Sequence, residues 1–241
     1  MIEQFWNYLK IGFKFRLCVF SIVYLGICFF GMAPTPFLKS LFLLITLPFV
    51  GVMACITATD TINKFTDILK MQFKKGAKIP IPDEVQALAD AMKVKIKEVK
   101  VVPGMLNAAV FPNGKVVIGD QILTCLDKKE FLAVFAHEFS HLKRGHHVKR
   151  ILALLCLLSF STMVFFNVPG LFQAYAILAF VSIVTIPINW RFEFDADADG
   201  KKFVGAGYMA STLQKISAGK NLNEASETHP PISKRIERLS V

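Results

Sequence analysis

Four of the five histidines in the chain fall between positions 137 and 147. Two of them, His137 and His141, are four residues apart, and Glu138 directly follows the first. On a helix, residues four apart share one face, so both imidazoles can bind one tetrahedral Zn²⁺. The Glu138 carboxylate could then accept a proton from a zinc-bound water. This spacing predicts a hydrolytic zinc site, and the alternative is two histidines on a solvated helix face.

A helix beginning near Lys128 is expected to position this motif. Asp127 and Glu130 have the spacing of a capping box, in which each side chain accepts a hydrogen bond from a backbone N–H near the helix start. Gly145 is expected to end the helix, which places the two histidines in its last turns. The apolar residues that recur at helical spacing before the motif are Phe131, Leu132, Val134 and Phe135.

A catalytic zinc site needs a third protein ligand and one position open to water. Glu193 is the favoured candidate, because on a helix it shares a face with Asp197, whose carboxylate could accept the other N–H of a ligand histidine. The alternative for this pair is an acidic, solvated helix end. His147 is a second candidate ligand, but in the extended H-E-x-x-H-x-x-G-x-x-H site the glycine lies one residue earlier than Gly145.

His229 is the last histidine, and two prolines that restrict the backbone follow it. Its imidazole could donate a hydrogen bond to the oxyanion of a tetrahedral intermediate. A histidine in a proline turn more often has a structural role, so both interpretations stay open at this point.

Long uncharged segments indicate a membrane protein. The chain is 54% hydrophobic with a mean hydropathy of +0.48, and a membrane-spanning helix needs about 20 apolar residues. We expect four such helices, at about 17–33 and 40–59 and as a pair within 151–190 that turns at 167–170. The alternatives are a signal peptide for the first segment and a buried hairpin for the last pair. Four of the five cysteines lie within these segments and are interpreted as small apolar core residues, neither metal ligands nor disulfides.

Basic residues flank the expected spans before 17, from 143 to 150 and from 191 to 202. By the positive-inside rule, the amino terminus and the segments 60–150 and 191–241 are therefore expected to face the cytoplasm. The formal net charge of +10 is then expected to favour contact with anionic lipids of the bilayer. No basic patch with interleaved aromatic residues points to nucleic acid as a partner.

The chain is thus expected to consist of two membrane parts, 1–59 and 151–190, and two cytoplasmic parts, 60–150 and 191–241. Within the cytoplasmic parts, apolar periodicity predicts helices over 60–75 and 83–92. A strand is expected over 99–102, and a hairpin joins 109–111 to 116–118 through Pro112, Asn113 and Gly114. These strands are expected to form a small antiparallel sheet.

The ordered motifs of the chain resemble those of the HtpX family of membrane zinc metalloproteases. The resemblance rests on residues 137–141, 193–197 and 228–235, with two expected spans before the first motif and two between the first and second. It implies a mainly α membrane protein of the bacterial inner membrane, with a cytoplasmic α+β zincin-like (gluzincin) catalytic domain. It also implies proteolysis of misfolded or damaged membrane proteins.

The resemblance also implies roles for individual residues. His137, His141 and Glu193 match the zinc ligands, and Glu138 matches the general base. The other matches are Asp197 and Arg235 beside the site, and Asn107 and Ala108 on a strand that binds the substrate backbone by β-addition. His229 and Arg235 match a segment linked to oxyanion binding, and either of them could be the oxyanion donor. The chain has little beyond Arg238, which leaves open any accessory element that admits substrates.

Two further functions compete with this one. A prenyl-protein peptidase of the membrane would share the ligand set but normally has more than four spans. A membrane scaffold that binds metal without catalysis would not need a carboxylate at Glu138. We therefore expect a zinc-dependent endopeptidase with polypeptide substrates.

Overall fold

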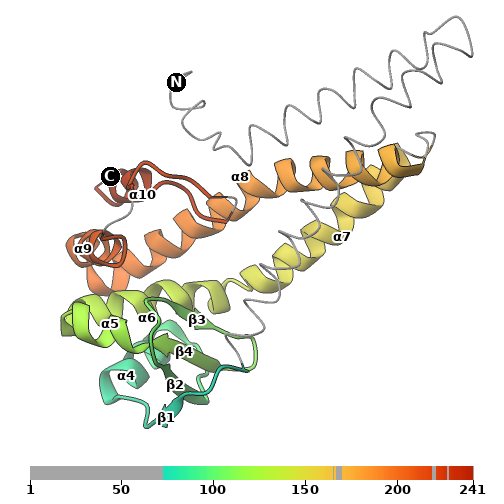
Figure 1. Ribbon diagram of the computed structural model, residues 1–241. Coiled ribbons are helices and arrows are strands. Elements are labelled where there is room, and N and C mark those ends of the chain that lie inside the picture. Colours follow the sequence, from blue (N-terminus) through green and yellow to red (C-terminus); the bar gives the residue numbers. More distant parts are fainter. Residues whose placement is uncertain (1–72, 165, 167–169, 219–220, 227, 241) are drawn as a thin grey trace, which may run out of the picture. The chain divides into compact units, whose positions relative to one another are not determined.

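The computed structural model describes residues 73–240 except 165, 167–169, 219–220 and 227 (Figure 1). The first two expected spans, most of the helix expected over 60–75 and most of the turn at 167–170 lie outside the described residues. The chain divides into two compact units. One includes Leu152–Ile186, and the other, Leu69–Ile151 with Pro187–Val241, contains the sheet and all three motifs.

The sheet has four strands in the order β1-β2-β4-β3. The strands are β1 (Ala77–Ile79), β2 (Glu98–Val102), β3 (Ala108–Val110) and β4 (Lys115–Gly119). The expected β3–β4 hairpin is confirmed as an antiparallel pair. The expectation of a purely antiparallel sheet is wrong, because β2 and β4 are parallel. After β2 the chain forms β3 at the edge of the sheet, and the hairpin then places β4 between β2 and β3. No turn signal in the sequence specifies the pairing of β2 with β4.

Seven helices are described, and α6 is central to the second unit. The helices are α4 (Asp83–Met92), α5 (Asp120–Cys125), α6 (Lys128–Lys143), α7 (His146–Val164), α8 (Gly170–Val204), α9 (Ala206–Ile216) and α10 (Ile232–Leu239). α6 packs against α4 and β3 and also against α9 (Figure 1). The helix predicted over 83–92 is confirmed as α4.

Apolar side chains on two faces of α6 explain this central position. Phe135 and Phe139 are fully buried in the core between the sheet and α4. Their rings meet edge to face at 5.5 Å between centroids, which is a favoured aromatic geometry. Ala133, on another face, packs with Met209 and Leu213 of α9. The motif residues are therefore carried by a helix that is fixed from both sides.

The predicted capping box at the start of α6 is confirmed. The Asp127 carboxylate accepts the N–H groups of Lys129 and Glu130, and Glu130 Oε2 accepts the N–H of Asp127 at 2.8 Å. Glu130 is only 2% exposed and also binds Lys215 Nζ on α9 at 2.6 Å. This carboxylate therefore fixes both the start of α6 and its contact with α9.

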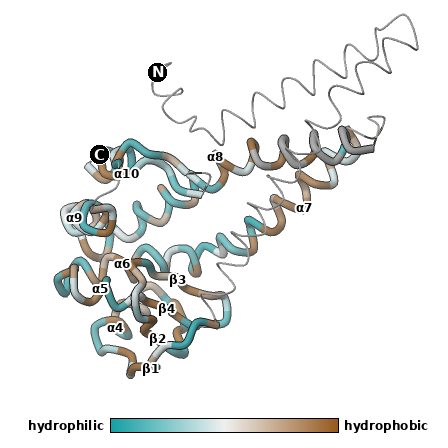
Figure 2. The backbone as a smooth tube through the Cα atoms, in the orientation of Figure 1, coloured by the Kyte–Doolittle hydropathy of each residue, from teal (hydrophilic) through white to brown (hydrophobic). Residues whose placement is uncertain are grey.

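α7 is the one helix among those described that is long and apolar enough to span a bilayer. Figure 2 shows the hydrophobic colouring along it. Its exposed apolar side chains include Ile151, Leu152, Leu155, Phe160 and Met163. α8 runs unbroken from Gly170 to Val204 with Pro187 inside it, so the segment expected as the fourth span and the Glu193 motif share one helix. Four spans stay a prediction.

Candidate metal centre

His137 and His141 of α6 meet Glu193 of α8 in one cluster. One potential ligand atom from each residue lies within 4.8 Å of the others. The two histidine Nε2 atoms are 3.1 Å apart, and each lies 3.4 Å from a carboxylate oxygen of Glu193. Glu193 is 2% exposed. The sequence motifs separated by the α7–α8 segment thus converge on one point.

Asp197, one helical turn after Glu193, orients His137. The Nδ1 atom of His137 lies 2.9 Å from Asp197 Oδ1. Arg235 of α10 donates from Nε and Nη2 to the two oxygens of Asp197, both at 2.7 Å. Burial raises the pKa of Asp197, but the guanidinium of Arg235 and the His137 ring outweigh it and lower that pKa below its usual range. Asp197 therefore stays ionised.

His141 has a different partner at its Nδ1 atom. That atom lies 2.8 Å from Nδ1 of His146, the first residue of α7. The His146 ring is buried and stacks on Phe192 of α8 at 4.4 Å between centroids and 13° between planes. Both His137 and His141 therefore have Nδ1 engaged by a neighbouring side chain, which leaves both Nε2 atoms directed toward Glu193.

These residues fit a divalent metal ion. Within the described part of the chain, Glu193 Oε2 is buried and has no hydrogen-bond partner. Burial raises the pKa of Glu193, but His137 and His141 outweigh it and hold the pKa well below the usual range. An ionised carboxylate and two imidazole nitrogens facing each other are the donor set found in hydrolytic zinc sites. Buried charges in proteins are paired or bind metal ions. Arg235 Nη1 lies 3.5 Å from this oxygen as an ion pair, and a metal ion would bind the oxygen directly.

Glu138 lies beside the cluster and is anchored by the sheet. Its Oε2 accepts the backbone N–H of Val110 at 3.2 Å. Burial raises the pKa of Glu138, although the neighbouring His137 opposes this. A raised carboxyl pKa brings a general base closer to neutral pH, which favours proton transfer.

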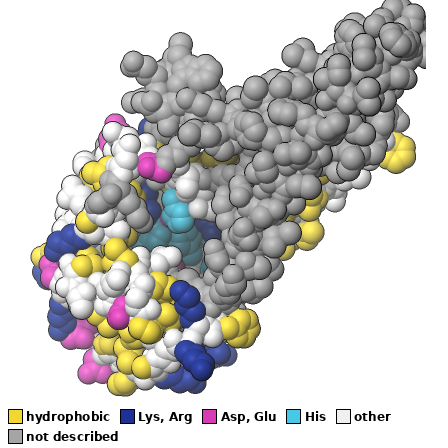
Figure 3. Space-filling view, viewed as in Figure 1, with side chains coloured by type: hydrophobic (Ala, Val, Ile, Leu, Met, Phe, Trp, Pro, Cys, Tyr) yellow, Lys and Arg dark blue, Asp and Glu magenta, His cyan; other side chains and the backbone are white. Residues whose placement is uncertain are grey.

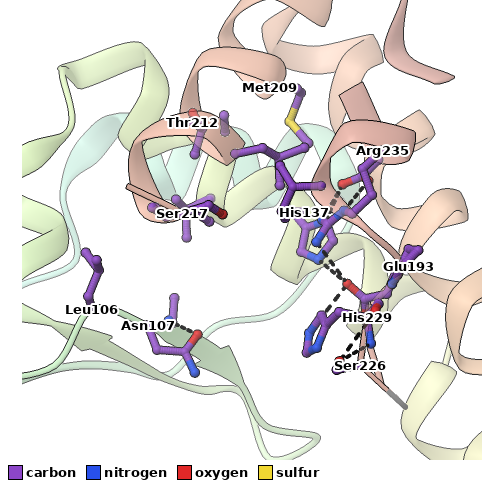
Figure 4. Close-up of a pocket in the computed structure, with 18 of the residues that line it drawn as sticks. Leu106, Asn107, His137, Glu193, Met209, Thr212, Ser217, Ser226, His229 and Arg235 are labelled. Atoms are coloured by element: carbon purple, nitrogen blue, oxygen red, sulfur yellow. Dashed lines mark hydrogen bonds and ion pairs between the residues drawn. The ribbon is translucent and has the colours of Figure 1, made fainter. Parts of the chain in front are cut away.

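A cavity of about 630 Å³ opens over these residues. Figure 3 shows histidine side chains in a recess of the surface. The polar residues that line the cavity include Glu138, Glu193 and His229, and the apolar ones include Met209 and Leu213 of α9. Figure 4 shows Glu193, His229 and Met209 around it. An extended peptide could therefore reach the cluster from solvent and place apolar side chains beside it.

His229 lies at the rim of this cavity. Its Nε2 is 3.7 Å from Glu193 Oε2, and its side chain is 58% exposed. Its Nδ1 lies 2.8 Å from Thr228 Oγ1, and its N–H donates to Ser226 Oγ at 2.9 Å. The Ser226 carbonyl in turn accepts the indole N–H of Trp190. The loop therefore directs Nε2 of His229 toward the cluster (Figure 4).

β3 is an edge strand next to the cavity. Asn107 and Phe111 hydrogen-bond to β4, so by the alternation of an antiparallel ladder the backbone groups of Ala108 and Val110 point to the open edge. The N–H of Ala108 donates to Asn107 Oδ1 at 2.9 Å. The N–H of Val110 donates to Glu138 Oε2. Asn107 and Ala108 both line the cavity.

His147 is not one of the clustered residues. The group of potential ligand atoms within 4.8 Å in the described part of the chain contains His137, His141 and Glu193. The His147 Nε2 atom is buried and has no hydrogen-bond partner among the described residues. The contact of His146 with His141 was missed from the sequence, although a histidine five residues after a candidate ligand, just past a glycine, was a usable signal.

Comparison with known proteins decides the family. The model of peptidase family M48 matches residues 80–241. The chain belongs to this family. It is a metalloprotease, as the motifs predicted, and the resemblance to HtpX is also confirmed.

Named relatives of this M48 chain include the protease HtpX of several bacteria. The one from Wigglesworthia glossinidia brevipalpis is 28% identical, over 75% of this chain and 73% of the relative. The one from Hahella chejuensis is 26% identical, over 66% and 70%. The one from Escherichia coli (strain K12 / DH10B) is 28% identical, over 52% and 58%.

A solved structure shares the fold. The crystal structure of S. mikatae Ste24p superposes with a TM-score of 0.54 at 17% identity. The match covers 100% of this chain and 67% of the other. At this identity the likeness concerns the arrangement of the chain, and the residue roles rest on the geometry of the cluster.

Proposed function

We propose that this M48 metalloprotease is a zinc-dependent membrane endopeptidase, with His137, His141 and Glu193 as the zinc ligands. The convergence of their three ligand atoms, with Glu193 Oε2 buried and lacking a hydrogen bond, carries the proposal. Asp197 fixes the ring of His137, and Arg235 fixes Asp197, so neither residue contacts the substrate in this proposal. Such supporting hydrogen bonds orient ligands and raise their basicity.

Glu138 is the general base in this proposal. A bound zinc ion supplies an acidified water and polarises the scissile carbonyl group. Glu138 accepts a proton from the attacking water and later passes it to the leaving amine. The hydrogen bond from Val110 N–H keeps one carboxylate oxygen against β3, so the other is free to face the water.

His229 is the proposed donor to the oxyanion. Its position at the cavity rim and the contact of Nδ1 with Thr228 support this role, because they leave Nε2 facing the cluster. A hydrogen bond that strengthens as negative charge develops lowers the barrier of the reaction.

The substrate is proposed to add to the open edge of β3. The outward backbone groups of Ala108, next to the cavity, support pairing with an extended peptide. The side chain of Asn107 already binds the outward N–H of Ala108, so a substrate would replace that bond. Backbone pairing selects unfolded polypeptides and has little dependence on side-chain sequence.

The membrane part of the proposal extends beyond the described residues. We propose four spans, at about 17–33, 40–59 and within 151–190, between cytoplasmic parts at 60–150 and 191–241. The apolar exposed surface of α7 supports the third span. The enzyme would then lie in the bacterial inner membrane with its site toward the cytoplasm, and misfolded or damaged membrane proteins would be its substrates.

Two other functions remain as rivals to this proposal. A prenyl-protein peptidase would use the same ligand set on a lipid-modified peptide. A scaffold that only binds metal would leave Glu138 without a role, whereas this carboxylate lies in the cavity beside the cluster.

The decisive experiment replaces Glu138 with Gln in the full-length enzyme in detergent. Zinc content should stay at one per chain, while cleavage of an unfolded polypeptide should fall by at least about 100-fold. His137→Ala, which should lose zinc, is the matched control. Equal cleavage by Glu138→Gln and wild type would exclude Glu138 as the base. Comparing a detergent-solubilised membrane protein, a soluble unfolded protein and a prenylated peptide as substrates separates the rival functions.

A further inference from the structure

The first turn of α7 contacts the candidate metal site through a histidine that the sequence motifs do not include. His146 is 1% exposed and lies between His141 of α6 and Phe192 of α8. Its Nδ1 is 2.8 Å from Nδ1 of His141, and its ring lies nearly parallel to that of Phe192. Phe192 directly precedes Glu193, so His146 is packed between one proposed ligand, His141, and the residue next to another.

The short contact between Nδ1 of His141 and Nδ1 of His146 requires the two nitrogens to have different protonation. One of them must carry a proton and the other must offer a lone pair. If His141 is to bind a metal through Nε2, the neutral ring carries its proton on Nδ1. Nδ1 of His146 must then be the acceptor. This arrangement parallels Asp197, which occupies the same position relative to His137.

The turn between α6 and α7 makes this contact possible. Gly145 has a φ of +63°, a conformation that side chains with a Cβ rarely adopt. The reversal at this glycine starts α7 immediately after α6, so a residue only five positions beyond His141 returns to its Nδ1. The contact is therefore a consequence of the local chain path and of the stack on Phe192.

We propose that His146 is a positioning residue for the metal site: it accepts the Nδ1–H of His141 and so keeps Nε2 of His141 free and aimed at the metal. The proposal rests on the proposed role of His141 as a zinc ligand. Each ligand histidine then has its own acceptor, a charged one from α8 for His137 and a neutral one from α7 for His141.

The competing explanation is that His146 only fills space against Phe192. Two substitutions separate these roles. His146→Phe keeps a flat ring that can stack on Phe192 but has no acceptor. His146→Asn loses the ring but places an amide oxygen on Cγ, where the histidine has Nδ1. An acceptor role predicts that Asn preserves function, and a packing role predicts that Phe does.

The measurement is the zinc dissociation constant of the full-length protein in detergent, determined by competition with a chelator. Loss of an acceptor that orients a metal-binding histidine weakens binding by about 10- to 100-fold. We expect this loss in His146→Phe and a change of less than about threefold in His146→Asn. The melting temperature of the metal-free protein should change less in His146→Phe than in His146→Asn. Phe192→Leu removes the stacking partner and should retain most of the affinity.

Several outcomes would overturn the proposal. One is wild-type affinity in His146→Phe, and another is an equal loss in His146→Asn and His146→Phe. If His146→Phe does not fold, His146→Ala takes its place. Failure of both variants to fold, while His146→Asn folds, would make His146 a folding residue and end the proposal. His141→Ala distinguishes failure of this proposal from failure of the proposed zinc site. Unchanged zinc binding in that variant would show that His141 is not a ligand and would overturn the proposed site itself.

Discussion

Nδ1 of His137 lies 2.9 Å from Oδ1 of Asp197, although sixty positions separate the two residues in the sequence. Arg235, from α10, binds both oxygens of the same carboxylate. Three helices that are distant in sequence therefore meet at one ligand ring. The orientation of His137 depends on the packing of α6, α8 and α10 together.

Asp197→Asn should weaken zinc binding by about tenfold with little loss of secondary structure. The amide oxygen can still accept the N–H of His137, but the charge that strengthens this bond and the pair with Arg235 is lost. The measurement is the zinc dissociation constant in detergent. Asp195→Asn, on the same helix but paired with the half-buried Arg144, is the control and should bind zinc normally. Equal affinities in the two variants would contradict the role of Asp197.

Glu193→Ala should remove zinc, and His147→Ala should retain it. The reason is that Glu193 completes the cluster of ligand atoms within 4.8 Å, to which His147 does not belong. Metal content after gel filtration distinguishes the two variants. Loss of zinc in His147→Ala alone would assign the third ligand to His147.

Ala108→Pro should raise KM for an unfolded polypeptide about tenfold or more while the zinc content stays unchanged. The N–H of Ala108 points to the open edge of β3, so its removal does not break the ladder with β4 but denies a bond to an added strand. Steady-state kinetics over a range of substrate concentrations measure the effect. Ala108→Gly keeps the N–H and serves as the control. A normal KM in the Pro variant would place the substrate elsewhere.

Glu130→Gln should destabilise the protein near neutral pH by about 2 kcal/mol. Burial raises the pKa of Glu130, but Lys215, Ser211 and the N–H of Asp127 outweigh it and lower the pKa to about 2. A carboxyl group whose pKa is lower in the folded state stabilises that state fully above its unfolded pKa near 4.5. This contribution is lost as the pH falls from about 4.5 to about 2.

Urea unfolding of both proteins across this pH range provides the measurement. The difference between wild type and Glu130→Gln should shrink toward pH 2. Glu84→Gln is the control, because Glu84 forms a salt bridge on the surface with Lys128 and should matter little. A difference that stays constant with pH would show that the Glu130 charge does not stabilise the fold.

Local signals in the sequence were sufficient to predict the helix and strand elements that carry the site. The capping box at Asp127 and Glu130, the glycine at 145 and the hairpin around Asn113 each predicted a structure that forms. These features depend on hydrogen bonds between residues a few positions apart, so the sequence alone contains them. The grouping of His137, His141 and Glu193 was also predicted, since the first two residues left a zinc site incomplete.

Relations between distant segments were harder to predict. The parallel pairing of β2 with β4 arises because β4, and not β3, lies beside β2. The alternating valines of these strands do not specify which strand takes that position. The contact of His146 with His141 was not predicted, because it depends on the turn at Gly145 and on stacking against Phe192, which belongs to another helix. Such contacts follow from the three-dimensional path of the chain, not from spacing.

The unbroken course of α8 has a consequence for the order of events during synthesis. His137 and His141 leave the ribosome well before Glu193 and Asp197, with the apolar segments of α7 and α8 between them. The newly made first half therefore has His137, His141 and Glu138, but neither Glu193, the proposed third ligand, nor Asp197, which lies against His137 Nδ1. On the proposed ligand assignment, the zinc site is therefore complete only after α8 has been made and Glu193 has reached the histidines of α6.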